Sequence, residues 1–146
     1  MIQTMKKYQP KNFSHLKGLQ GITDEVFEIH FKLYEGYVNR TNSLTEHLAT
    51  LDREKRASGA DPVYAEMTRR LGYEYNGMIL HELYFGNLKP GGREAAPQSN
   101  LKTALEKNFD SYQLWLDDFK ATERSKYVEA FLSNINWEAV EKRLLH

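Results

Sequence analysis

One pattern constrains the fold of this chain more than any other, because side chains suited to a helix interface recur at alternating steps of four and three residues. Its members are His30, Tyr34, Tyr37, Thr41, Leu44, Leu48 and Leu51. An α-helix has 3.6 residues per turn, so these steps return to one face. Thr23 is a good N-cap, and Asp24 and Glu25 follow in the first turn, where the helix dipole favours acids. We predict a long amphipathic helix over about 23–57, with Gly59 as its stop.

A second long helix is predicted over about 61–88. Asp61 is a suitable cap, and Pro62 occupies the first helical position, where its missing N–H is not needed. One face of this segment carries Tyr64, Met67, Leu71, Met78, His81 and Phe85. The run from Gly86 to Gly92 contains Pro90 and ends the helix. Because the connection between the two segments is short, the two helices should pack as an antiparallel hairpin.

The remainder of the chain is also predicted to be helical after an extended leader. The predicted segments are the leader over 1–22, a helix over 100–108, a second one after 110, and a last region over about 126–145 interrupted near 134–136. Ser99 caps the first of these helices, and Asp110 with Gln113 has the form of a capping box. Asn136 can cap a final turn or two. No segment has convincing period-two alternation, so the predicted class is all-α.

Composition excludes several functional classes. Lys plus Arg is 20 and Asp plus Glu is 20, and this zero balance argues against binding to nucleic acid. There is no cysteine, which excludes disulfides, thiolate nucleophiles, iron–sulfur clusters and thiolate zinc sites. No apolar run is long enough to cross a membrane, and the first residues have no apolar signal core. A cytoplasmic protein is expected.

Two of the five histidines differ from the others. The five are His15, His30, His47, His81 and His146. His47 and the terminal His146 should face solvent, and His15 could pack over the helix pair. The face of each long helix described above is called its seam. His30 lies on the seam of the first helix and His81 on that of the second, where inward-facing histidines at matching heights can share one metal ion. The alternative is that each is a core histidine with a tyrosine or backbone partner, and spacing alone favours that alternative.

Phenol side chains are frequent around these histidines. The seam region contains Tyr34, Tyr37, Tyr73, Tyr75 and Tyr84. A tyrosine hydroxyl can orient a metal-bound water and relay a proton, but tyrosine is also a good half-buried packing residue, and the residues alone favour packing. The sequence contains no nucleophile elbow, phosphate loop or dinucleotide fingerprint. The carboxylates are scattered on polar helix faces, where a solvated role is expected.

Several segments of the sequence resemble segments of the iron/manganese superoxide dismutases, and they occur in the same order as in that family. They are Glu28-Ile29-His30-Phe31 followed by Tyr37-Val38-Asn39, the run 76–85 followed by 87–92, the run 108–120, and 127–132 followed by 136–138. The run 76–85, Asn-Gly-Met-Ile-Leu-His-Glu-Leu-Tyr-Phe, is the most specific of these. On this resemblance the chain is identified as a member of that family.

The resemblance implies roles for individual residues. His30 would be the first metal ligand and His81 the second, and Tyr37 the gateway tyrosine beside the metal. Gly77 occupies a position where many iron enzymes place a glutamine, and glycine there resembles the manganese pattern. The family usually has one more residue between the first His and the Tyr, and its further histidine is replaced by Tyr34. A seven-residue step still returns to the same helix face, so His30 and Tyr37 should point the same way.

A larger departure from the family lies between residues 120–122 and 124–127. There the family has its central sheet, which supplies the third and fourth metal ligands and an outer-sphere Gln or His. The implied fold is therefore an α+β family fold without its sheet, all-α as it stands: a long antiparallel helical hairpin plus short C-terminal helices. The implied domains are an N-terminal helical-hairpin domain over 1–92 and a remnant of the C-terminal domain over 93–146.

Two functions remain open at this stage. The first is a superoxide dismutase or a direct derivative, which would dismute superoxide at mononuclear manganese or iron if a complete ligand set is available. The second is a non-catalytic helical remnant that self-associates or binds a partner through the surface left by the missing sheet. Glu35, Glu74 or Glu82 could replace the missing carboxylate, but the spacing singles out none of them. The resemblance implies manganese or iron as the metal. Two imidazoles alone bind these ions weakly, so a remnant would carry either no metal or adventitious zinc or nickel on His30 and His81. A homodimer or higher oligomer is expected, because the missing sheet exposes apolar surface.

Overall fold

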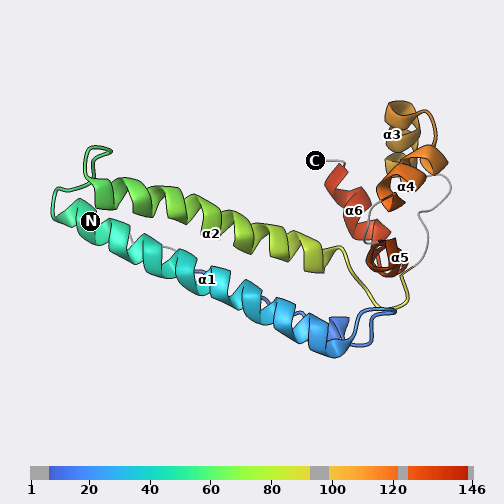
Figure 1. Cartoon of the computed structure of the whole chain (residues 1–146), viewed down its shortest axis with the longest axis horizontal. Helices are drawn as coiled ribbons and strands as arrows, with labels where there is room; N and C mark the ends of the chain where they lie inside the picture. The colour runs from blue at the N-terminus through green and yellow to red at the C-terminus, as the bar shows by residue number, and fades with distance from the viewer. Residues whose placement is uncertain (1–6, 93–98, 122–124, 145–146) are drawn as a thin grey trace. The chain divides into compact units, whose positions relative to one another are not determined.

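The structure, a computed structural model, describes residues 7–92, 99–121 and 125–144, and regular structure in these ranges is helical. The elements are a 3-10 turn η1 (Ser14–Leu16) and the helices α1 (Asp24–Arg53), α2 (Pro62–Gly86), α3 (Asn100–Phe109), α4 (Tyr112–Lys120), α5 (Ser125–Ser133) and α6 (Trp137–Leu144). These ranges contain no strand, only an isolated antiparallel bridge between Leu88 and Ile135. The all-α prediction is confirmed for the described part of the chain. Figure 1 shows α1 and α2 as its longest elements.

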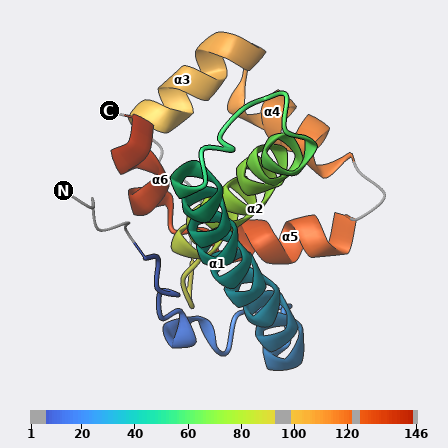
Figure 2. The same ribbon diagram turned by 90° about the vertical axis from the view of Figure 1, so that its left-hand side faces the viewer.

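The chain divides into two compact units. The first contains residues 28–83 together with the leader segment 7–12, and the second contains 13–27 and the described residues from 84 onward. In the first unit, α1 and α2 run side by side in opposite directions (Figures 1 and 2). This is the antiparallel hairpin predicted from the two seams.

The predicted seams form the interface between α1 and α2. On α1, Tyr34, Thr41 and Leu51 are buried, as is Met78 on α2. The seam of α2 also includes Glu74, which is fully buried and was absent from the predicted face. An interface of this kind supplies most of the stability of a helical hairpin, because isolated helices are marginal in water.

Helix α1 ends earlier than predicted, at Arg53 rather than near residue 57, and Gly59 is not its stop. The Arg56 N–H donates to the Leu51 carbonyl at 2.8 Å, and the Lys55 N–H donates to the Asp52 carbonyl at 2.9 Å. This pair of bonds is a Schellman motif. Lys55 supplies the left-handed residue, with φ of 58°, in place of the expected glycine.

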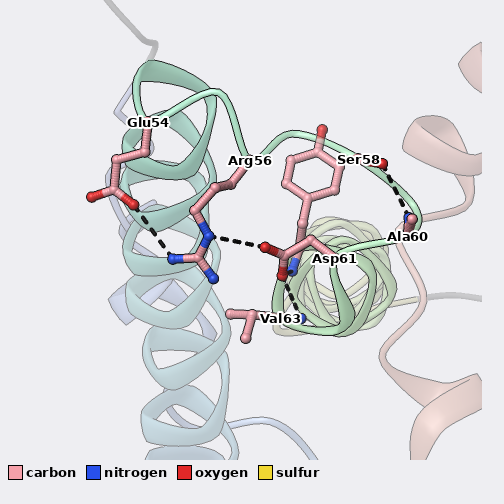
Figure 3. A network of polar contacts seen from close by, with 7 residues as sticks. Glu54, Arg56, Ser58, Ala60, Asp61 and Val63 are labelled. Carbon is pink, nitrogen blue, oxygen red and sulfur yellow. Dashed lines mark hydrogen bonds and ion pairs between the residues drawn. The ribbon is translucent and has the colours of Figure 1, made fainter.

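An ion pair closes the turn between the helices. Arg56 Nε donates to Asp61 Oδ2 at 2.9 Å, and Figure 3 shows its guanidinium between Glu54 and Asp61. The other oxygen of Asp61 accepts from the Val63 N–H at 2.9 Å and the Tyr64 N–H at 3.2 Å. The Tyr64 N–H is the main reason that the pKa of Asp61 is lowered, helped by Arg56 and Val63. The predicted Asp61 cap is confirmed, and Pro62 begins α2.

The second unit has its own core. Phe85 packs against Phe13 and Phe27, with ring centroids 4.9 Å and 5.6 Å apart. Asn134 is fully buried, and its Nδ2 donates to the Gln20 and Ala130 carbonyls, each at 2.7 Å. Its Oδ1 accepts from the Gln20 N–H at 3.0 Å. One side chain therefore ties the leader to α5.

The caps of the short helices follow the sequence with one exception. Ser99 accepts from the Lys102 N–H and caps α3 as predicted. Helix α4 is capped by Ser111, which accepts from the Leu114 N–H at 3.0 Å, so the predicted Asp110 capping box is wrong. The reason is that Asp110 takes a φ of 64° as the C-cap of α3 and cannot begin the next helix.

The C-terminal region divides into α5 and α6, as the predicted interruption near 134–136 requires. Asn136 caps α6, because its Oδ1 accepts from the Ala139 N–H at 3.3 Å. The leader is not extended throughout, since it contains η1, whose Leu16 is buried in the second unit.

The structure describes two of the other three histidines. His47 is exposed on α1 as predicted. His15 is exposed within η1, next to Phe13 at a centroid distance of 6.3 Å. His146 lies outside the described residues. None of the helices described is long and apolar enough to cross a membrane.

Candidate metal centre

The structure brings His30 and His81 together in the first unit. Their ring centroids are 4.8 Å apart, and the rings are inclined at 77°. His30 lies on the α1 seam and His81 on the α2 seam, at matching heights of an antiparallel pair. The two histidines therefore contact each other, as the predicted shared site requires.

The tautomer of His81 is fixed by its own helix. Its Nδ1 lies 2.7 Å from the Gly77 carbonyl oxygen. A carbonyl oxygen can only accept, so Nδ1 carries the proton and Nε2 carries the lone pair of the neutral ring. A backbone carbonyl on the second nitrogen is the usual support of a metal-binding histidine.

The surroundings of His30 disfavour its protonated form. Burial lowers the pKa of His30, and the charge of the neighbouring His81 lowers it further. Two imidazoles on one ion, with nitrogen–metal distances of about 2.0–2.1 Å and an angle of about 90–110°, have ring centroids about 4.5–5.2 Å apart. The observed separation of 4.8 Å lies within that interval. The pair fits two of the ligands of one metal ion.

Tyr37 lies beside the pair. Its ring centroid is 5.0 Å from that of His81, so the seven-residue step from His30 does return it to the site. A hydrogen bond with Tyr73 is the first cause of its raised pKa, followed by burial and by the charges of Tyr73 and Glu74. The phenol therefore keeps its proton at neutral pH.

Gly77 makes the position of Tyr37 possible. A Cβ on Gly77 would lie 2.4 Å from both Cδ1 and Cε1 of Tyr37, so the ring packs directly on the α2 backbone. Any side chain here, including the glutamine of many iron enzymes, would displace the tyrosine. The sequence pointed to Gly77 only through the family pattern, and the contact gives the physical reason for a glycine.

Replacing Gly77 by alanine should lower the free energy of unfolding by about 2 kcal/mol, because the added methyl forces Tyr37 off the backbone. Gly72→Ala is the matched control on the same helix, since a Cβ there has no atom within 4 Å. That control should stabilise the protein by about 0.5–1 kcal/mol through helix propensity. Urea unfolding measures both. Equal effects of the two substitutions would contradict the close contact.

A charged group that was absent from the predicted face of α2 lies next to Tyr37. The buried Glu74 accepts from Arg40 Nε at 2.8 Å and from Arg70 Nε at 2.7 Å. The Arg40 guanidinium lies 5.0 Å from the centroid of Tyr37, and that of Arg70 lies 5.2 Å from the centroid of Tyr73. The burial of Glu74 could have been predicted, because this residue fills the helical step between Leu71 and Met78.

Two of the carboxylates considered as substitute metal ligands have other partners. Glu74 is held by the two arginines, and Glu82 accepts from the Tyr34 hydroxyl at 3.0 Å and pairs with Lys11. Glu35 is partly exposed on α1. Among the residues that the structure describes, no group of three or more His, Asp or Glu could hold a metal ion. The described chain thus offers two imidazoles and no carboxylate.

Tyr34, at the position of the family's further histidine, ties the leader to the hairpin. Its buried hydroxyl accepts from the Lys11 N–H at 3.0 Å and donates to Glu82. Burial is the first cause of its raised pKa. Tyr34 is also stacked near His81, with a centroid distance of 6.4 Å. Its contacts are those of a packing residue at the edge of the site.

Comparison with known proteins gives several similar sequences. The chain is 37% identical over 119 residues to an iron superoxide dismutase of Aquifex aeolicus. The matched residues are 79% of this chain and 55% of that protein. It is 36% identical over 119 residues to the iron superoxide dismutase of Aquifex pyrophilus, with the same coverage. It is 32% identical over 101 residues to a manganese superoxide dismutase of Haloferax volcanii, or 68% of this chain and 48% of that protein. No family model matches the chain.

The chain spans about half the length of these relatives. Three observations agree: the level of sequence identity over more than two thirds of this chain, the geometry of the histidine pair and the resemblance of the motifs. The chain belongs to the iron/manganese superoxide dismutase family.

Proposed function

We propose that this chain is a superoxide dismutase derivative that holds one metal ion through His30 and His81. With further ligands completing the site, it would convert two superoxide ions and two protons into oxygen and hydrogen peroxide. One observation carries the proposal: the two imidazoles and Tyr37 lie together in one unit, at centroid distances of 4.8 Å and 5.0 Å. The names of the relatives support superoxide as substrate and manganese or iron as metal.

Each residue has a distinct part in the proposed chemistry. Bound manganese or iron would supply the one-electron change that superoxide dismutation needs. His30 and His81 would hold the ion through neutral imidazole nitrogens, with the Gly77 carbonyl orienting His81. Tyr37 would keep a proton at its phenol oxygen, supported by its bond to Tyr73.

Replacing Tyr37 by phenylalanine tests the proposal, because the ring stays and only the hydroxyl is lost. In an enzyme the variant should keep its metal content yet lose turnover at high superoxide flux, when proton delivery limits the cycle. Its free energy of unfolding should fall by only about 1 kcal/mol, the value of one hydrogen bond. Stopped-flow decay of superoxide, on metal-quantified wild-type and variant protein, measures the effect. The enzymatic proposal would be contradicted if the wild-type protein, reconstituted with manganese or iron, removes superoxide no faster than buffer.

A second candidate function is a non-catalytic helical remnant that associates through its apolar surface. The observation in its favour is a set of large apolar side chains exposed in the first unit, namely Ile29, Leu33, Val63, Tyr73, Tyr75, Leu80 and Leu83. Metal content of the purified protein separates the two candidates. An enzyme should contain near-stoichiometric manganese or iron, and a remnant should contain neither.

A further inference from the structure

A pocket of about 540 Å³ lies in the first unit, between the leader and the two helices of the hairpin. Pockets that bind small molecules have volumes of about 300–1,000 Å³, so this one is large enough for such a ligand. The residues of the candidate metal centre, His30, Tyr37, Gly77 and His81, are not among those that line it. The pocket is therefore a feature that the proposed dismutase chemistry does not use.

The hydroxyl of Thr41 on α1 points to a ligand. Thr41 is 1% exposed and lines the pocket. Among the residues that the structure describes, its Oγ1 has no hydrogen-bond partner. A buried hydroxyl without a partner costs free energy, and a threonine hydroxyl can both donate and accept a hydrogen bond. A ligand with a hydroxyl of its own would satisfy both needs of Thr41.

Two further threonines define the polar character of the pocket. On α1, the Thr45 hydroxyl donates to the Thr41 carbonyl at 2.8 Å, and on α2 the Thr68 hydroxyl donates to the Tyr64 carbonyl at 2.9 Å. Each hydroxyl has a single hydrogen, so these two oxygens have only lone pairs left to offer. The polar group of a ligand must therefore be able to donate, which a hydroxyl does and a carboxylate does not.

The rest of the wall is aromatic and apolar, from Tyr8, Tyr75 and Leu71. The rings of Tyr8 and Tyr75 meet edge to face, with centroids 5.9 Å apart and planes inclined at 64°. Asn42 holds Tyr8 in place, because its Oδ1 accepts from the Tyr8 N–H and its Nδ2 donates to the Tyr8 carbonyl, each at 2.9 Å. Such an arrangement favours a further aromatic ring, which gains by offset or edge contact with both phenols.

No charged side chain lines the pocket. Burial raises the pKa of Tyr8, and the neighbouring Tyr75 raises it further, so that phenol is uncharged at neutral pH. A charged ligand would lose hydration here without gaining an ion pair. The pocket is therefore suited to an uncharged molecule.

We propose that this pocket binds a small, uncharged aromatic alcohol. Its ring lies against Tyr8, Tyr75 and Leu71, and its hydroxyl exchanges hydrogen bonds with Thr41. Binding needs neither a metal ion nor the histidine pair, so the inference goes beyond the proposed function and does not depend on it.

Titration of the nitrogen-15-labelled chain with p-cresol, followed by nuclear magnetic resonance, tests the inference. The amide signals of Thr41, Thr45 and Gly72 should shift together and saturate at one p-cresol for each chain. Toluene, which has the ring without the hydroxyl, should bind about 3- to 10-fold more weakly, the effect of one uncharged hydrogen bond. The charged 4-methylbenzoate should cause no saturable shift of these signals.

Replacing Thr41 by valine keeps the shape of the side chain and removes its hydroxyl. The variant should bind p-cresol about 3- to 10-fold more weakly and toluene as well as the wild-type chain does. Its urea unfolding midpoint should not fall, because the hydroxyl that is removed has no partner to lose. Thr50→Val is the matched control, since Thr50 is exposed on the same helix and does not line the pocket. It should leave both affinities unchanged.

Filling the pocket from Gly72 is a second, independent test. Gly72 lines the pocket on α2, and a Cβ there would have no atom within 4 Å. Leucine favours a helix more than glycine does, so Gly72→Leu should fold while its side chain occupies the space of the ligand. The variant should lose saturable binding of both p-cresol and toluene. Arg69→Leu, at an exposed position of the same helix outside the pocket, should keep it.

The outcomes that contradict the inference differ from those that bear on dismutation. Absence of saturable p-cresol binding, or binding that Gly72→Leu leaves unchanged, would overturn the pocket as its site. Equal affinities for p-cresol and toluene, or an unchanged p-cresol affinity in Thr41→Val, would overturn the role of the hydroxyl. Binding of 4-methylbenzoate as tight as that of p-cresol would overturn the choice of an uncharged ligand. Superoxide decay and metal content, measured separately, test the proposed function alone.

Discussion

Replacing Arg40 and Arg70 together by alanine should lower the free energy of unfolding by about 3–5 kcal/mol, because it leaves a buried carboxylate without its charged partners. Glu74 has no exposed side-chain surface, and both of its oxygens accept from these arginines. The arginines themselves are about half exposed, at 46% and 49%. The cost therefore arises at Glu74 and not at the positions substituted. Urea unfolding at neutral pH measures it.

Two controls make this expectation specific. Glu74→Leu removes the charge and the need for the arginines together, so it should change the free energy of unfolding by less than about 1.5 kcal/mol. Arg69→Ala breaks an ion pair with Glu66 in which both side chains are at least 60% exposed, so its effect should stay within about 0.5 kcal/mol. A double arginine variant as stable as Arg69→Ala would show that Glu74 does not depend on its partners.

Asn134→Ala, in the second unit, should also lower the free energy of unfolding strongly, by about 3 kcal/mol. The substitution removes three hydrogen bonds and leaves the Gln20 N–H and the Gln20 and Ala130 carbonyls without them. Each buried group left unsatisfied costs about 1–3 kcal/mol, although water can reach some of them. Thermal and urea unfolding measure the loss, and amide exchange at Gln20 should rise with it.

Asn108→Ala is the matched control for Asn134. Asn108 is exposed, and its Nδ2 donates only to the Ala104 carbonyl of its own helix at 2.7 Å. Its replacement should change the free energy of unfolding by no more than about 0.5 kcal/mol. Similar losses for both variants would mean that the burial of Asn134 contributes nothing to its effect.

The pattern of the sequence determined the hairpin and the place of its histidines. Period 3.6 fixes which side chains share a face, so the seams of α1 and α2 could be read without a structure. Local chemistry then located the caps at Asp61, Ser99 and Asn136, because a cap needs only its own side chain and the next turn. The meeting of His30 with His81 followed from two seams and a short turn.

Tertiary structure decided the features that depend on residues far apart in the chain. A charge sits in the seam at Glu74 because Arg40, on the other helix, neutralises it together with Arg70. Periodicity records only which face a residue lies on, whereas the partner that makes a buried polar group tolerable comes from elsewhere in the fold. For that reason the histidine pair was predictable from the sequence, and the surroundings of Tyr37 required the structure.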